Sequence, residues 1–221
     1  MRNLLRYTIA LCLLSSSAFA AQIPLPSPLS ALLVAGENNF VVVGDLTFDS
    51  FSYVATGDMP PAADINVLEW ADSAGNTGLR FQGGFVDAAA GGASDALIGF
   101  SVVSNGAPIS DAHLSANPDV LGGTEGTGVG SITETFLPEI ANDSLSVFDN
   151  GSVEQLSDSI VFNVPVGSLN VQKDILLLSA QGGAGATISF VDQTFTQTPE
   201  PAAFASLLVG LIGLGTLRRR R

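Results

Sequence analysis

His113 is the only histidine of the chain, so it is the first residue to consider for acid–base chemistry. It follows Asp111 by two positions and lies between Ser110 and Ser115, which together supply the residue types of a serine hydrolase triad. A triad also needs a nucleophilic serine on a sharp elbow, and the sequence contains no G-x-S-x-G segment. We therefore expect His113 to be a surface or loop residue bonded to a neighbour. A zinc site is not expected around a single histidine.

Carboxylates are the other candidates for catalysis, because a glycosidase needs two acids about 5 to 10 Å apart in a cleft. The acids nearest to predicted strand ends are Asp87, Asp95, Asp111 and Glu134. The alternative is that acidic side chains simply solvate the outer faces of a β domain, and the sequence favours it. We expect no catalytic residue.

Calcium is the ligand that the acids fit best, because it takes hard oxygen donors from loops and exported proteins meet it at high concentration. Asp87 and Asp95 stand at the two ends of a segment made of alanine, glycine and serine. No EF-hand or nonapeptide repeat is present. The sequence thus predicts Asp87 and Asp95 as a calcium site at most, and otherwise no cofactor.

Two further patterns invite a binding role. Exposed aromatic residues such as Trp70, Tyr53 and Phe85 could stack on sugar rings, although Trp70 follows Val67 and Leu68 and is expected in the core. The glycines between 126 and 130 resemble a phosphate-binding loop, but they precede a strand-like run and not a helix. We interpret them as a flexible loop.

The elements that must position these residues are short β-strands. Apolar and polar residues alternate in short runs bounded by Gly, Asp, Asn and Pro, and no apolar pattern persists at helical spacing. The predicted strands are 41–48, 51–54, 65–70, 79–85, 97–103, 132–137, 145–148, 153–156, 159–164, 169–178 and 186–195. This number of short strands predicts an all-β fold, a single antiparallel β-sandwich or jelly-roll-like domain over residues 40–196.

Four details refine that expectation. The parity of the apolar positions changes at Asp49-Ser50, as a β-bulge or a corner requires. Residues 97–103 are apolar on both faces, which indicates a central strand. Asp149-Asn150-Gly151 is a hairpin turn signal. The alternate prolines of residues 21–39 favour an extended lead-in segment.

The charge balance excludes some partners. The chain has 8 basic and 21 acidic residues, and between residues 21 and 196 the only basic ones are Arg80 and Lys173. A surface this acidic repels nucleic acid, which is not expected as a partner.

The N-terminus has the features of an export signal. Arg2 and Arg6 precede an apolar run from Tyr7 to Leu14, and Ala18-Phe19-Ala20 forms an A-x-A cleavage site. We expect residues 1–20 to be a signal helix that signal peptidase removes at Ala18 and Ala20. Cys12, the only cysteine, would leave with it, so the mature chain would have neither disulfides nor thiolate chemistry.

The C-terminal residues 197–221 combine three parts: Pro199-Glu200-Pro201, an uncharged segment from Ala202 to Leu217, and the cluster Arg218, Arg219, Arg220 and Arg221. A helix of about 16 residues is roughly 24 Å long and spans a bilayer narrowly when arginine stems snorkel to the headgroups. The arginines are expected to stay cytoplasmic. One interpretation is an ordinary, permanent transmembrane anchor.

The order of these three parts resembles the sorting tail of PEP-CTERM proteins, which are substrates of exosortase. The resemblance implies that exosortase cuts near Pro199, Glu200 and Pro201 after the tail has held the protein transiently in the inner membrane. It further implies delivery to the cell surface or the extracellular matrix and an association with exopolysaccharide and biofilm. Thr198 stands where many members have valine. The resemblance covers only the tail.

Two functions follow for the central domain. The first is a non-catalytic structural or binding module associated with extracellular polysaccharide, supported by the absence of a nucleophile and of clustered metal ligands in the sequence. The second is a secreted glycan-active hydrolase or lyase with an acidic catalytic pair. A cleft with two close, buried carboxylates would favour the enzyme.

Overall fold

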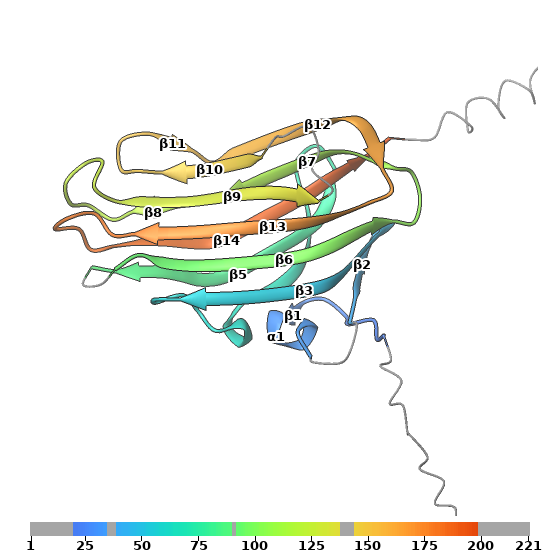
Figure 1. Ribbon diagram of the computed structural model, residues 1–221, viewed down its shortest axis with the longest axis horizontal. Coiled ribbons are helices and arrows are strands. Elements are labelled where there is room, and N and C mark those ends of the chain that lie inside the picture. The colour runs from blue at the N-terminus through green and yellow to red at the C-terminus, as the bar shows by residue number, and fades with distance from the viewer. Residues whose placement is uncertain (1–19, 35–38, 90–91, 138–143, 199–221) are drawn as a thin grey trace, which may run out of the picture.

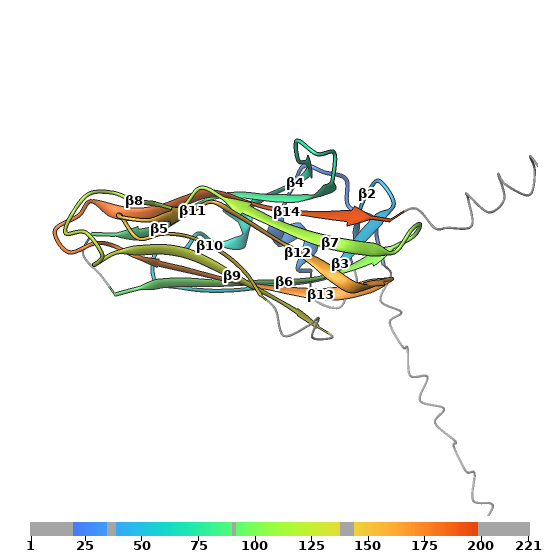
Figure 2. The ribbon, with the colours of Figure 1, turned by 90° about the horizontal axis from the view of Figure 1, so that it is seen from above.

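The computed structural model describes residues 20–34, 39–89, 92–137 and 144–198 of the chain. Within them, two seven-stranded antiparallel sheets stack face to face (Figures 1 and 2). The predicted all-β sandwich is therefore confirmed. No helix among the described residues is long and apolar enough to cross a membrane; the segment 202–217, for which a spanning helix is expected, lies outside them.

The first sheet has the strand order β1-β4-β5-β14-β7-β12, and β8 pairs with β14 beside this path. Its strands are β1 (Ser27–Pro28), β4 (Asn66–Ala71), β5 (Thr77–Ala88), β7 (Ile109–Ala116), β8 (Asp119–Val120), β12 (Ser157–Val166) and β14 (Gly185–Gln197). The long strand β14 therefore lies at the centre of this sheet.

The second sheet has the strand order β11-β10-β9-β13-β6-β3-β2. Its strands are β2 (Val41–Val43), β3 (Leu46–Thr56), β6 (Ser94–Ser104), β9 (Val129–Leu137), β10 (Leu145–Asp149), β11 (Glu154–Gln155) and β13 (Ser168–Leu178). β6 lies between β13 and β3, so the prediction of a central strand at 97–103 is confirmed. β10 and β11 form the hairpin expected around Asn150.

The core lies between the sheets and is rich in phenylalanine. Phe48 and Phe100 of the second sheet meet Phe195 and Phe81 of the first, with ring centroids 6.2 Å and 5.8 Å apart. Aromatic pairs at such distances stabilise by about 0.5 to 1.5 kcal/mol beyond their burial. Phe85, one of the aromatic residues considered for sugar stacking, is also fully buried.

The bulge predicted at Asp49-Ser50 is present. Asp49 pairs with Ser101 but Ser52 pairs with Gly99, so β3 contains one extra residue, and Ser50 has φ 53°. The run 41–48, however, is not one strand as expected, because Gly44 with φ 57° turns the chain between β2 and β3. Beyond this turn, β3 continues through the bulge as one strand.

The lead-in segment contributes to the core. Its residues form β1, the helical turn α1 (Leu29–Leu32) and an isolated bridge between Gln22 and Phe40. Leu29 and Leu32 are buried, so the apolar residues behind the prolines pack against the sandwich. A short 3₁₀ helix, η1 (Ala62–Asp64), precedes β4.

Candidate functional site

The outer face of the first sheet carries a cleft of about 370 Å³. Side chains from strands β4, β7, β12 and β14 and from the turn after β4 line it. Alternate residues of each strand point away from the core and so reach this outer face. The lining residues are Trp70, Asp72, His113, Leu114, Ser115, Ser157, Asp158, Ser159, Asp192 and Thr194. An aromatic residue at one side, a polar floor and a serine-bearing edge strand thus share one open surface.

Trp70 is partly exposed on this face, so the expectation that it belongs to the core is wrong. Val67 is the buried residue of β4, and Trp70 lies at the opposite parity, toward solvent. The Arg80 guanidinium stacks 3.3 Å from the centroid of the indole ring. A cation over an aromatic face is attractive, so Arg80 restrains the orientation of Trp70.

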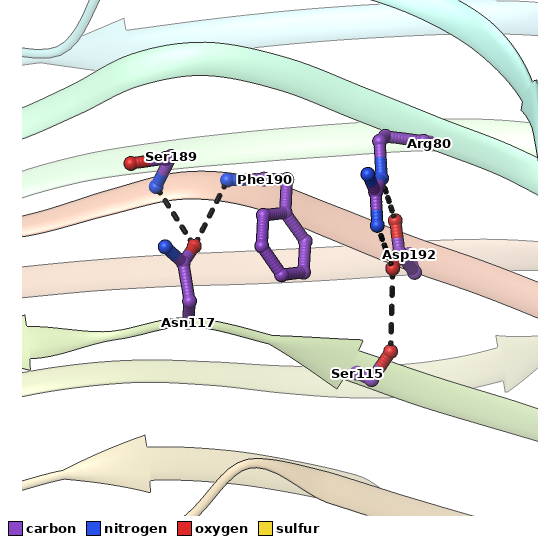
Figure 3. Close-up of polar contacts among 6 residues, drawn as sticks. All are labelled: Arg80, Ser115, Asn117, Ser189, Phe190 and Asp192. Atoms are coloured by element: carbon purple, nitrogen blue, oxygen red, sulfur yellow. Dashed lines mark hydrogen bonds and ion pairs between the residues drawn. The ribbon is translucent and has the colours of Figure 1, made fainter.

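Arg80 is itself held in place by Asp192 of the neighbouring strand β14 (Figure 3). Its Nε and Nη2 donate to the two carboxylate oxygens of Asp192 at 2.6 and 2.7 Å, and the two residues are direct partners in the β5–β14 pairing. The Phe190 ring centroid lies 4.3 Å from the guanidinium carbon. Bidentate pairing fixes the plane of the guanidinium, so these contacts pre-organise the aromatic side of the cleft.

Asn117 supports the same arrangement from the end of β7 (Figure 3). Its Oδ1 accepts hydrogen bonds from the backbone N–H groups of Ser189 at 3.0 Å and Phe190 at 3.1 Å. The β5–β14 register shifts between Ile188 and Phe190. Asn117 therefore holds the backbone of β14 where the register shifts and keeps Phe190 beside Arg80.

A chain of hydrogen bonds links Asp72, His113 and Thr194 of the cleft through Asn76 and Thr196 beside it. Thr194 donates to Asp72 Oδ2 at 3.1 Å, and Asn76 Nδ2 donates to the same oxygen at 2.8 Å. Thr196 donates to Asn76 Oδ1 at 2.9 Å and lies 3.0 Å from His113 Nε2. Burial raises the pKa of Asp72, but the bonds from Asn76, Thr194 and Ala74 outweigh it, so the pKa is lowered overall. Asp72 is thus held as a carboxylate.

His113 is bonded to a neighbour, as expected, but it lies on a strand and not in a loop. In β7, Ile109, Ala112, Leu114 and Ala116 are buried while His113 faces outward. This alternation was the available signal for the strand. It was missed because alanine and serine, which have low strand propensity, occupy many of its positions.

The acids proposed for a catalytic pair do not meet in this cleft. Glu134 is fully buried between the sheets, bonded to Lys173. Asp87 accepts hydrogen bonds from Ser94 and Ser179, whereas Asp95 neighbours Asp174. None of the four candidates lines the cleft.

Asp87 and Asp95, the expected calcium ligands, have separate surroundings. The oxygens of Asp87 accept from Ser94 Oγ at 2.8 Å and from Ser179 Oγ and N at 2.6 and 2.7 Å. Burial raises the Asp87 pKa, but these bonds outweigh it and lower the pKa overall. In the part of the chain that the structure describes, no three metal-ligating side chains gather in one place. Residues 90–91 between the two acids lie outside it, and calcium binding there stays a prediction.

The processing sites fall almost entirely outside the described residues. These are Ala18, Pro199, Glu200, Pro201, Arg218, Arg219, Arg220 and Arg221. Ala20 is described and is exposed. Signal-peptidase cleavage and exosortase recognition stay predictions.

No protein-family model matches the chain, and no curated protein matches it. Among solved structures it is similar to TmCBM61 in complex with β-1,4-galactotriose, with 12% identity over 67% of this chain and 89% of that one and a TM-score of 0.36. It is also similar to the xylan-binding module CBM15, with 13% identity over 66% of this chain and 91% of that one and a TM-score of 0.31. A third is Xylanase10C from Cellvibrio japonicus in complex with xylopentaose, with 13% identity over 66% of this chain and 27% of that one and a TM-score of 0.31. TM-scores this low say nothing about what the chain binds.

Proposed function

We propose that the domain is a non-catalytic module that binds extracellular polysaccharide in the cleft on the outer face of the first sheet. The observation that carries this proposal is Trp70, a partly exposed indole that lines an open, polar cleft and is held by Arg80. Aromatic rings supply apolar area for the faces of sugar rings, and hydroxyl and carboxylate groups beside them can bond sugar hydroxyls.

The charge of the cleft favours neutral polysaccharides. Asp72, Asp158 and Asp192 line it, and the nearest cation, Arg80, is already paired with Asp192. The whole chain has a formal net charge of −13. Like charges repel, so polymers rich in uronic acid or sulfate should bind less well than neutral ones.

The alternative, a glycan-active hydrolase or lyase, needs a carboxylic acid that stays protonated near neutral pH. Among the acids of the cleft, Asp72 has the opposite property, because its hydrogen bonds lower its pKa and favour the carboxylate. Asp158 accepts hydrogen bonds from the backbone N–H groups of Ser146 and Ser159, both at 2.9 Å. These arrangements favour a binding surface over general acid catalysis.

Replacing Trp70 by alanine is expected to weaken binding to a neutral polysaccharide by about tenfold or more, because a central aromatic anchor contributes at least about 1.4 kcal/mol. Affinity gel electrophoresis against galactan, xylan, mannan and β-glucan measures the change. Val164→Ala is the matched control, since Val164 is 72% exposed on β12 of the same sheet and does not line the cleft. If wild type and Trp70→Ala migrate alike in every polymer, the cleft is not the binding site.

We further propose that the chain reaches the polysaccharide as an exported protein whose C-terminal tail exosortase removes. The support is the sequence of Pro199-Glu200-Pro201, an apolar segment and four terminal arginines. Mass spectrometry of the mature protein from the cell surface or medium is expected to find a C-terminus upstream of Leu217. A mature chain that still carries Arg218 to Arg221 would indicate a permanent anchor.

A further inference from the structure

Three polar side chains meet in the interior of the sandwich, away from the cleft. Lys173 of β13 and Glu134 of β9 are direct partners in the second sheet, and Gln193 reaches them from β14 of the first sheet. All three are 0% exposed. Nζ of Lys173 donates hydrogen bonds to Glu134 Oε2 and to Gln193 Oε1. One nitrogen therefore contacts a carboxyl group and a carboxamide at the same time.

The surroundings of this triad are apolar. On each strand, the residues two positions away share the inward face, and they are buried. These neighbours are Ile132 and Phe136 on β9, Val171 and Ile175 on β13, and Val191 and Phe195 on β14. Charges are costly in such surroundings unless every group is paired, and Glu134 Oε1 has no hydrogen-bond partner among the described residues.

The pKa values of both ionisable groups are shifted in the direction that favours the neutral form. Burial lowers the pKa of Lys173 and raises the pKa of Glu134, and in each case it outweighs the attraction between the two. The side chain of Gln193 is near enough to Glu134 to contribute to its pKa as well. In its neutral form the amine is a nucleophile, and in its protonated form the carboxyl is a proton donor, so the contacts of the triad bring these two groups together with a carbonyl carbon.

We propose that Lys173 and Gln193 form an intramolecular isopeptide bond, with Glu134 as the residue that moves the protons. The lone pair of Lys173 Nζ attacks Cδ of Gln193, and a C–N bond forms. Glu134 donates a proton to the departing carboxamide nitrogen, the old C–N bond breaks, and one molecule of ammonia leaves. Glu134 then regains a proton from Nζ. The step is an acyl transfer without change of oxidation state, so no oxidant or co-reactant is needed.

The bond would join the two sheets covalently. Lys173 and Gln193 are 20 positions apart in sequence and belong to opposite layers, so the link closes the β13–β14 connection across the core. A cross-link of this kind limits the unfolded chain as a disulfide does. It would serve a chain whose only cysteine, Cys12, lies in the expected export signal.

Peptide mass spectrometry of the full chain tests the proposal. An endoproteinase that cuts before aspartate releases Asp158–Lys173 separately from the peptide that begins at Asp192. We expect the two to be recovered as one branched species, lighter than their sum by one ammonia. In the denatured protein, trypsin should also fail to cut after Lys173, because its amine is acylated.

Two variants and one control test the roles of Glu134 and Lys173 in forming the bond. Glu134→Gln keeps the amine and the carboxamide but removes the acid, and it is expected to yield the two peptides unlinked. Lys173→Met should do the same, whereas Gln172→Met, on the exposed face of β13, should retain the link. Unlinked peptides from the wild-type chain would overturn the proposal. So would a product lighter by one water that joins Lys173 to the peptide containing Glu134, because Gln193 would then not be the acyl donor.

Discussion

Lys173→Met is expected to lower the free energy of unfolding by about 3 to 5 kcal/mol, since it leaves Glu134 buried without its partner and also removes the proposed cross-link. Glu134 and Lys173 are both 0% exposed, so water cannot replace the lost contact. The side-chain volume changes little, so a cavity contributes little to the effect. Urea unfolding monitored by Trp70 fluorescence measures the loss.

The double variant Lys173→Met/Glu134→Leu separates two contributions. It removes the unpaired carboxyl together with the amine, and a well-packed apolar pair is often as stable as the buried polar pair that it replaces. We expect it to recover more than half of the loss, and the remaining deficit measures the contribution of the cross-link. Equal stability of the single and double variants would show that the unpaired carboxyl costs nothing.

Gly78→Ala is expected to destabilise the fold by about 3 kcal/mol, near the upper end for overpacking a close contact. A Cβ atom at Gly78 would lie 2.8 Å from Cα of Thr194 and would collide with the carbonyl oxygen of Gln193. These are backbone atoms of β14, the central strand of the first sheet, and cannot move aside as a side chain can. Thermal and urea unfolding measure the change.

Gly84→Ala is the matched control for this substitution. Gly84 belongs to the same strand, β5, and a Cβ atom there would meet nothing within 4 Å. We expect its effect to stay within about 0.5 kcal/mol, as for most exposed substitutions. Similar losses at both positions would mean that strand propensity, and not the close approach of β5 and β14, sets the requirement for glycine.

The sandwich was predictable because its strands follow the period-two pattern closely. Even the bulge at Asp49-Ser50 left a trace, since the parity of the apolar residues changes there. Strand β7 was not predicted, because its outward residues resemble a loop and its inward ones include two alanines. Pattern recognition depends on large apolar residues, and a strand that packs with small ones lacks them.

The triad could have been placed in the core from the sequence. Glu134 has the parity of Ile132 and Phe136, and Lys173 has that of Val171 and Ile175, so each stands on the inward face of its strand. Glu134 and Lys173 belong to residue types of opposite charge, which is typical of a buried pair. The contact with Gln193 was not accessible in this way, because it depends on how one sheet lies over the other.

The cleft could not be assembled from the sequence either. Trp70, His113 and Ser157 lie on strands that are distant in the chain, and they come together only through the order β4-β5-β14-β7-β12. Many strand orders are compatible with the same pattern of strands. Trp70 was expected in the core because tryptophan is usually well buried and its neighbours are apolar.

The strand order also decides which strands lie at the open edges of the two sheets. The outermost strands are β1 with Pro28, β12 with Pro165, and the two- and three-residue segments β11 and β2. Proline offers no N–H for a neighbouring chain, and segments this short give little template for strand addition. Many copies crowded together should thus remain individually folded and should not merge into amyloid-like ribbons.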